Sequence, residues 1–203
     1  MPPNHRKALN HLKRVDPVMA DVIAQVGRCT LEPRTEWTHF DALVRSIVYQ
    51  QLSGKAAATI HGRVLTLIGD GAEAPSRIVA TSHEALRGAG LSTAKANYVR
   101  NLADHVLDRS LPIDSLDAMD DDQIIAALTQ VKGIGRWSAQ MFLMFRLGRP
   151  DVLPELDLGV QKGIQKAYRM RKLPTPAQVL KRGARWSPYR TVAAWYMWRI
   201  LEV

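Results

Sequence analysis

Residues 128–140 read Leu128-Thr-Gln-Val-Lys-Gly-Ile-Gly-Arg-Trp-Ser-Ala-Gln140 and place two glycines, one residue apart, between two amphipathic segments. Glycine accepts positive φ angles and leaves the neighbouring backbone amides uncovered. The second segment begins a helix here, so its free N–H groups point outward at the positive end of the helix dipole. A phosphate group can approach such a turn and accept several backbone hydrogen bonds. The turn therefore predicts contact with a nucleic-acid backbone, which carries no base-sequence information.

The rest of the chain predicts helices nearly throughout. Apolar residues such as Val99 and Leu102 recur at helical spacing, whereas the alternation typical of strands is scarce. The pair Asp16-Pro17 divides the first helix, because proline suits a first helical position and aspartate can cap it. We expect helices over 6–26 with that break, from 38 to about 51, over 55–68, after Ser82, after Ser92, after Asp120, and over 136–147, 158–168, 176–184 and 189–201.

Composition narrows the class of protein. The chain has 203 residues and carries 28 Lys and Arg against 19 Asp and Glu, a net charge of +9, which favours a polyanionic partner. Cys29 is the single cysteine, so an internal disulfide and an all-cysteine zinc or iron–sulfur site are excluded within one chain. The basic start lacks the apolar stretch of a signal peptide, and no apolar run is long enough to span a bilayer. We expect a soluble, cytoplasmic protein without a membrane partner.

A carboxylate follows the glycine turn at a suggestive distance. The segment Leu153-Pro-Glu-Leu-Asp157-Leu-Gly-Val160 places Asp157 after a proline-containing loop, before an amphipathic segment, and 20 residues beyond Trp137. Aspartate at this position can cap the helix that begins at Leu158. Capping would also hold the side chain in place, so it is compatible with a chemical role.

Together, the turn and this aspartate resemble the helix-hairpin-helix base-excision glycosylases. The Pro-x-x-Asp-Leu-Gly-Val form is similar to the 3-methyladenine DNA glycosylase II (AlkA-type) branch, and the resemblance runs from about His11 to Trp198. It implies an all-α fold of two helical lobes, one over about 36–150 with the hairpin and one over about 1–35 plus 151–203, with the active-site cleft between them. Many relatives carry a second aspartate where this chain has Leu156, and the length leaves no room for the N-terminal β-domain of the best-known AlkA-type enzyme.

The resemblance also implies a reaction. Asp157 would be the catalytic carboxylate, which stabilises the oxocarbenium character that develops as a base leaves deoxyribose, or orients and deprotonates the attacking water. Bifunctional members carry a Schiff-base lysine where this chain has Trp137, so we expect a monofunctional enzyme without lyase activity. An alkylated purine is cationic, and an indole face attracts it. The implied substrate-binding residues are Trp137, Trp198, Met141 and Leu158.

The DNA contacts implied by the resemblance lie in two turns. The turn Gln50-Gln51-Leu52-Ser53 corresponds to the loop that enters the duplex, where a wedge side chain fills the gap left by a flipped nucleotide. Gln51 is the expected wedge, with Leu52 next. The expected hairpin contacts are Lys132, Gly133, Gly135 and Ser138, and carbonyl groups of Thr129, Val131 and Ile134 would hold a structural Na⁺ or K⁺. No catalytic cofactor is expected, and the expected partner is double-stranded DNA with alkylated bases, bound by a monomer.

Three alternatives remain open from the sequence. The chain could be a glycosylase of the same superfamily for uracil, a mismatched base or an oxidised base. It could be a hairpin-based DNA-binding module without catalysis. The glycines could also serve an ordinary turn between helices, the tryptophans could be core residues, and the basic surface could serve solubility.

Overall fold

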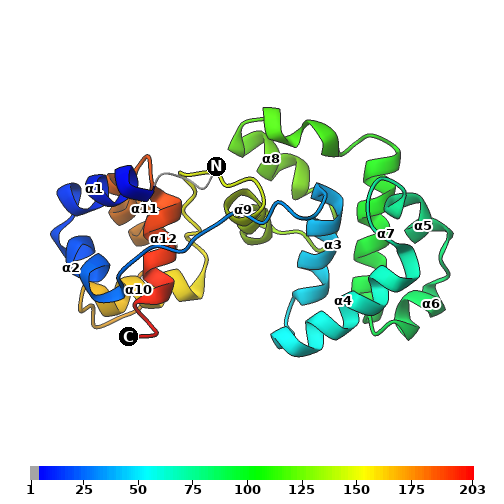
Figure 1. The fold of residues 1–203 in the computed structure, drawn as a ribbon, viewed down its shortest axis with the longest axis horizontal. Coiled ribbons are helices and arrows are strands. Elements are labelled where there is room, and N and C mark those ends of the chain that lie inside the picture. The colour runs from blue at the N-terminus through cyan, green and yellow to red at the C-terminus, as the bar shows by residue number, and fades with distance from the viewer. Residues whose placement is uncertain (1–4) are drawn as a thin grey trace. The chain divides into compact units, whose positions relative to one another are not determined.

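The computed structural model describes residues 5–203, and every regular element within that range is a helix (Figure 1). The expectation of an all-α fold is therefore confirmed for the described chain. None of the described helices combines the length and the apolar character needed to cross a bilayer. Residues 1–4, at the start of the expected second lobe, lie outside the described part.

The chain divides into two compact units. We call Arg34–Phe142 the hairpin unit, and the described part of residues 1–33 together with Leu143–Val203 the carboxylate unit. The expected boundary lay near residue 150, whereas residues 143–150 group with the carboxylate unit. The reason is hydrogen bonding. Within this segment Arg149 N donates to Leu143 O, and Thr191 Oγ1 of the carboxylate unit donates to Arg149 O.

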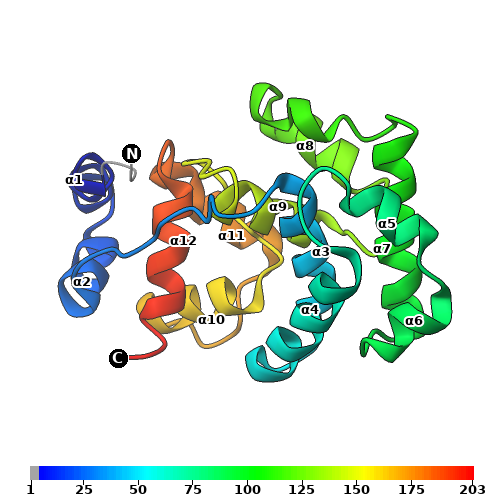
Figure 2. The ribbon, with the colours of Figure 1, turned by 45° about the vertical axis from the view of Figure 1, so that its right-hand side comes forward.

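In the hairpin unit, α7 lies beside α5 and also packs on α3, and Figures 1 and 2 both show α5 and α7 side by side. Fully buried side chains fill the core, among them Leu43, Ile47, Ile78 and Leu102. The sequence analysis predicted neither α5 nor η1, both of which are short. The elements are α3 (His39–Tyr49), α4 (Gly54–Ile68), α5 (Ala74–Ala80), α6 (His83–Gly88), α7 (Thr93–Leu107), η1 (Ile113–Ala118), α8 (Asp121–Leu128) and the start of α9 (Arg136–Phe145).

In the carboxylate unit, α10 packs against α12. The two helices are in close contact, since only the absence of a side chain at Gly163 of α10 leaves room for α12. A Cβ added there would stand 1.9 Å from Met197 O. Trp186 and Trp195 are buried, as expected for core residues. The elements are α1 (His5–Val15), α2 (Pro17–Val26), the end of α9, α10 (Leu158–Ala167), α11 (Pro176–Gly183), η2 (Ala184–Trp186) and α12 (Arg190–Arg199).

Asp16 organises the core of the carboxylate unit. Its Oδ1 accepts hydrogen bonds from Val18 N and Met19 N at the start of α2, so the predicted cap and break are confirmed. Its Oδ2 accepts from Tyr168 Oη and, at 2.9 Å, from Trp186 Nε1. A buried carboxylate is costly unless it is well bonded. These four bonds satisfy Asp16 and tie α2 to the segments after α10 and α11.

Candidate active site and nucleic-acid interface

Asp157 begins α10 in the carboxylate unit. It is the N-cap residue with extended backbone, and its Oδ1 accepts a hydrogen bond from Val160 N at 2.8 Å. The predicted capping is confirmed. The side chain is half-buried, while its neighbours Leu156 and Leu158 are 51% and 52% exposed. The carboxylate is thus held at the positive end of a helix and flanked by apolar surface.

Trp198 of α12 fixes the same carboxylate oxygen. Its Nε1 donates to Asp157 Oδ1 at 2.8 Å, and its ring stacks on Phe145 with centroids 5.7 Å apart and planes at 25°. A Cβ added at Gly159 would stand 2.7 Å from Trp198 Cδ1, so only glycine admits the ring here. The sequence analysis expected Trp198 to contact the damaged base. The structure gives it the further task of orienting Asp157, and base contact stays a prediction.

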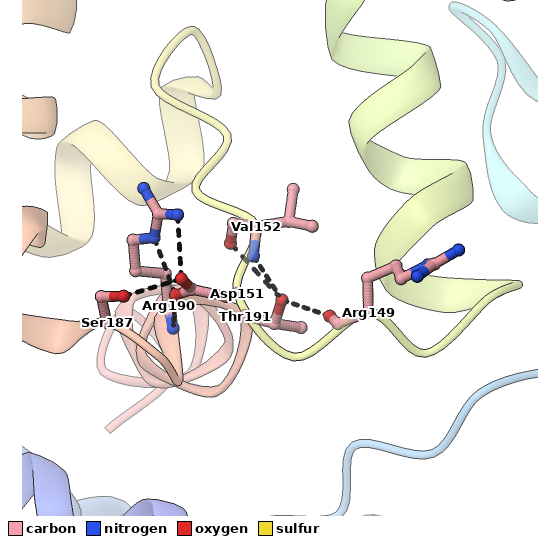
Figure 3. A network of polar contacts seen from close by, with 6 residues as sticks. All are labelled: Arg149, Asp151, Val152, Ser187, Arg190 and Thr191. Carbon is pink, nitrogen blue, oxygen red and sulfur yellow. Dashed lines mark hydrogen bonds and ion pairs between the residues drawn. The ribbon is translucent and has the colours of Figure 1, made fainter. Parts of the chain in front are cut away.

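The loop that leads to Asp157 is anchored through Asp151 (Figure 3). Asp151 Oδ1 accepts from Arg190 Nε at 2.8 Å and from Arg190 N, while Oδ2 accepts from Arg190 Nη2 and from Ser187 Oγ. Burial by itself would raise the pKa of Asp151, but the bonds from Arg190 and Ser187 outweigh it and hold the pKa below its ordinary value. Asp151 is therefore charged at neutral pH and joins the loop to the start of α12.

Thr191 makes a second anchor in the same loop, also drawn in Figure 3. Its hydroxyl accepts from Val152 N at 2.9 Å and donates to Arg149 O at 2.6 Å. Further along, Gln161 Nε2 donates to Glu155 O at 2.9 Å. Hydrogen bonds with Thr191 of α12 and Gln161 of α10 thus hold the backbone before Asp157, although this backbone lacks regular secondary structure.

The glycine turn joins α8 to α9 as the sequence predicts. Gly133 adopts a φ of +89°, and a Cβ there would stand 2.3 Å from Tyr98 Cδ2, so glycine is required twice over. A Cβ at Gly135 would meet no atom within 4 Å. Lys132 N donates to Asn101 Oδ1 at 2.8 Å. Gly133 shapes the turn, while Gly135 leaves an open approach to the first amides of α9.

The turn between α3 and α4 carries the expected wedge. Gln51 is exposed and has a φ of +56°, a left-handed conformation that costs a non-glycine residue about 1–3 kcal/mol. Leu52 is 39% exposed, and Ser53 caps α4 by accepting from Ala56 N. Strain of this kind persists only where the surroundings impose it. The structure therefore presents Gln51 and Leu52 at the tip of a constrained turn.

Helix α7 supplies the constraint. Lys95, Tyr98 and Asn101 lie three residues apart, so they share one face of that helix. Lys95 Nζ donates to Val48 O at 2.8 Å and to Gln50 O at 2.6 Å, and burial lowers the pKa of Lys95. Since Tyr98 and Asn101 contact residues 133 and 132, one helix face supports both turns. No sequence signal identified Lys95 as a partner of residue 50.

The two turns also contact each other directly. Gln50 Nε2 donates to Gly133 O at 2.8 Å, across 83 positions of the sequence. Gln50 was expected to contact DNA, and in the structure its amide nitrogen holds the wedge turn to the hairpin. The hairpin unit thus contains one connected set of backbone turns.

The remaining predicted residues are distributed as follows. Trp137 is 42% exposed in the first turn of α9, and Met141, four residues on, is half-buried on the same side of the helix. Ser138 is buried, so an interaction with DNA at this position would come from its backbone amide in the first turn of α9. Trp137 and Met141 belong to the hairpin unit, whereas Asp157, Leu158 and Trp198 belong to the carboxylate unit.

The expected monovalent cation would use carbonyl ligands. Val131 O accepts from Ile134 N at 3.0 Å, so a hydrogen bond closes the turn between residues 131 and 134. Thr129 ends α8 with its hydroxyl donating to Ile125 O and Ala126 O. Hard oxygen ligands suit alkali cations, and within residues 5–203 no cluster of His, Cys, Asp and Glu offers an alternative metal site.

Several known proteins are similar to this chain in sequence and in fold. The alkylbase DNA glycosidase-like protein of Schizosaccharomyces pombe is 30% identical over 97% of this chain and 94% of its own. DNA-3-methyladenine glycosidase from Bacillus halodurans is 40% identical with a TM-score of 0.83, covering 94% of this chain and 87% of that one. The 3-methyladenine DNA glycosylase of S. pombe, solved in complex with abasic DNA, is 31% identical with a TM-score of 0.82 and 97% coverage of both chains.

Residues 44–188 match the family described as HhH-GPD superfamily base excision DNA repair protein. That range contains the wedge turn, the helical hairpin, Asp151 and Asp157, and it ends two residues before Arg190. The match covers well over half of the chain, and the similarity to relatives extends over nearly all of it. This chain therefore belongs to the HhH-GPD superfamily of base excision DNA repair proteins.

Proposed function

We propose that this protein is a monofunctional DNA glycosylase that removes alkylated bases of the 3-methyladenine and 7-methylguanine type from duplex DNA and leaves an abasic site. The observation that carries the proposal is the fixed carboxylate of Asp157, whose Oδ1 accepts from Val160 N and from Trp198 Nε1, both at 2.8 Å. Relatives named as 3-methyladenine glycosylases share the fold over nearly the full chain, which supports the same substrate class.

Asp157 acts on charge that develops at the sugar. As the bond from C1′ to the base nitrogen breaks, the electron pair leaves with the base, and a cationic alkylpurine departs as a neutral molecule. The sugar becomes an oxocarbenium ion that the carboxylate stabilises; water then adds to C1′ and gives up a proton, which Asp157 can accept. One charge pair at about 4 Å contributes roughly 4 kcal/mol at an effective dielectric near 20. If felt only in the transition state, this is about a thousandfold in rate.

The absence of lyase activity is part of the proposal. A Schiff-base mechanism needs a lysine amine on the second helix of the hairpin, and α9 places Trp137 in its first turn. Lys132 lies before Gly133, with its backbone N–H donating to Asn101. Hydrolysis by water, without strand cleavage, is the reaction that these residues support.

Trp137 supports a preference for cationic lesions. Its partly exposed indole offers a π face, and cation–π attraction contributes about 0.5–2 kcal/mol, more as the cation is desolvated. A neutral lesion such as uracil would gain little of this attraction. We further propose that the enzyme acts as a cytoplasmic monomer and that Thr129, Val131 and Ile134 hold Na⁺ or K⁺ through their carbonyls. That cation would stabilise the hairpin turn when a phosphate is bound to it.

The test compares the parent protein with Asp157→Asn on methylated duplex DNA. Asparagine can still cap α10 and accept from Trp198, so the fold and DNA binding should persist while base release falls by about a thousandfold. Free bases are resolved by chromatography, and strand breaks are scored before and after alkaline treatment. Released 3-methyladenine with breaks only after alkali supports excision of alkylated bases without lyase activity.

Other outcomes separate the alternatives. Strand breaks without alkali would contradict monofunctional chemistry. Release by the parent of uracil or oxidised bases, but not of alkylated ones, would move the enzyme to another lesion class. Intact DNA binding without release of any base would support a non-catalytic module.

A further inference from the structure

The net positive charge of the protein lies in the unit that lacks the hairpin. The hairpin unit has 11 Lys and Arg against 12 Asp and Glu, a net charge of −1. The carboxylate unit has 17 against 7, a net charge of +10, and residues 1–4 contribute no charged side chain to it. The excess charge that would attract a polyanion is thus separate from the turns that contact the DNA backbone in the sequence-based interpretation.

Within the carboxylate unit the charge is concentrated toward the C-terminal end. Between Leu158 and Leu201 the chain has ten Lys and Arg and not one Asp or Glu, and the next acidic residue is Glu202. Like charges at this density repel one another and oppose compact folding. A bound polyanion would offset that repulsion.

One face of α11 gathers three of these cations. Gln178, Lys181, Arg182 and Arg185 follow the i, i+3, i+4, i+7 spacing that puts side chains on one side of a helix, and η2 continues directly from α11. With Met170 they line a hollow of about 280 Å³. We call these four residues the α11 surface; α11 is labelled in Figure 2.

Local contacts hold the α11 surface in place. Thr175 and Gln178 form a reciprocal capping box at the start of α11, and Arg182 Cζ lies 3.9 Å from the centroid of the Tyr168 ring. At the other end of the helix, a Cβ added at Gly183 would stand 2.3 Å from Leu153 Cδ2. Leu153 belongs to the loop that leads to Asp157, so α11 packs directly on the segment that precedes the candidate catalytic carboxylate.

The cations of the α11 surface differ from Arg77 and Arg199 in their partners. Arg199 is paired with Glu202 and Arg77 with Glu73, so their charges are locally neutralised. Among the described residues, Lys181 and Arg185 are exposed and make no ion pair with the protein. Two unneutralised cations beside a fixed guanidinium form a site for phosphate oxygens.

We propose that the α11 surface binds backbone phosphates of duplex DNA, as a second contact region that anchors the carboxylate unit independently of the hairpin. The proposal deepens the proposed function, but it needs only DNA binding and not base excision. Backbone amides at the hairpin fix position, whereas attraction over distance needs net charge, which the hairpin unit lacks. The α11 surface supplies that charge and, through Leu153, transmits the anchoring to the segment that carries Asp157.

The test is the salt dependence of DNA binding by Lys181→Gln/Arg185→Gln. Arg182 is left in place because of its contact with Tyr168. The matched control is Arg77→Gln/Arg199→Gln, which also removes two positive charges, but from residues that form ion pairs with glutamates. Affinity for an undamaged duplex, and for the same duplex with an abasic-site analogue, is measured by fluorescence anisotropy from about 50 to 200 mM salt.

If the α11 surface contacts two phosphates, the slope of log affinity against log salt falls in magnitude by about 1.8, and affinity near 0.1 M salt falls on the order of tenfold per lost contact. The loss should be equal for both duplexes, with little change in the control pair and no change in base release at saturating enzyme.

Equal slopes for the parent and the α11 variant would overturn the proposal and leave an acidic protein as the partner for this surface. Equal losses in both double variants would also overturn it, because bulk charge would then be responsible. If the slope changes as expected while the parent releases no alkylated base, the proposed function fails and this inference holds.

Discussion

The hairpin unit and the carboxylate unit offer different physical means of interaction with DNA. The hairpin unit presents backbone groups, at a glycine turn and at a strained wedge turn, and its net charge is −1. The carboxylate unit presents side chains, a fixed Asp157 and a surface of cations, and its net charge is +10. The difference teaches that a recognisable DNA-binding motif need not coincide with the electrostatic footprint of the protein, because amide dipoles position a phosphate without net charge.

The largest effect should come from adding one methyl group at Gly163, where two helices of the carboxylate unit are in close contact. Gly163→Ala places a Cβ 1.9 Å from Met197 O, so α10 and α12 must separate. We expect the free energy of unfolding to fall by about 1–3 kcal/mol or more, and base release to fall with it because Trp198 moves away from Asp157. Urea denaturation and base release measure the two effects.

The control is a helical glycine of the hairpin unit. A Cβ at Gly62 in α4 meets no atom within 4 Å, so Gly62→Ala should raise stability by about 0.5–1 kcal/mol. If Gly163→Ala were as stable as Gly62→Ala, the close packing that we assign to α10 and α12 would be refuted.

The two hairpin glycines should separate stability from binding. Gly133→Ala combines a positive φ with overlap on the Tyr98 ring, and we expect a loss of about 1–3 kcal/mol of unfolding free energy. Gly135→Ala meets no protein atom, so the fold should persist while the added methyl group hinders phosphate and weakens DNA binding several-fold. Thermal melting and anisotropy distinguish the two. Unchanged DNA binding by Gly135→Ala would remove this turn from the interface.

A smaller effect is expected at Lys95, which sharpens the comparison by testing side-chain support inside the hairpin unit. Lys95→Met leaves Val48 O and Gln50 O without their donor, so the wedge turn loosens. We expect about tenfold weaker binding to a duplex with an abasic-site analogue and reduced base flipping, followed by 2-aminopurine fluorescence. Lys95→Arg should restore part of both. Lys13→Met, on the exposed side of α1, removes the same charge and should have little effect on flipping.

The smallest effect is a pH dependence in the carboxylate unit. The pKa of Asp151 is held below its ordinary value of 3.8, so its contribution to stability is complete above that value and is lost as pH falls through the lower folded pKa. Asp151→Asn should therefore be less stable than the parent at neutral pH, with the difference shrinking in acid. Ser187→Ala keeps the bonds from Arg190 and should lie between the two. A constant difference between Asp151→Asn and the parent across urea titrations at each pH would contradict this account.

Much of the fold could be predicted because its signals are local. The caps at Asp16, Ser53 and Asp157 are each within three residues of the amides they bind. The helix from residue 136 was expected to reach 147 but ends at Phe145, and the last helix covers Arg190–Arg199 within the expected 189–201. Short elements such as α5 were missed, because seven residues give too little periodicity to detect.

The candidate site was predicted in part. The resemblance identified Asp157, the hairpin and the wedge turn. It implied that Trp198 contacts the damaged base, whereas the structure shows that Trp198 donates a hydrogen bond to Asp157. The spacing of Gly159 and Gly163 on one helix could have indicated the close approach of α12, since small residues four apart leave a groove. Lys95 and Asp151 carried no such signal, because lysine and aspartate are ordinary surface residues.

The sequence by itself determined most of the helices, several of their caps, the glycine turn and the total charge, because each of these depends on residues within a few positions or on composition. Only the tertiary structure decided that Trp198 holds Asp157 across 41 positions and that Lys95 holds the wedge turn across 45. It also decided how the charge divides between the two units. Contacts between distant residues depend on how helices pack, and packing is set by the shapes of whole surfaces rather than by any one segment.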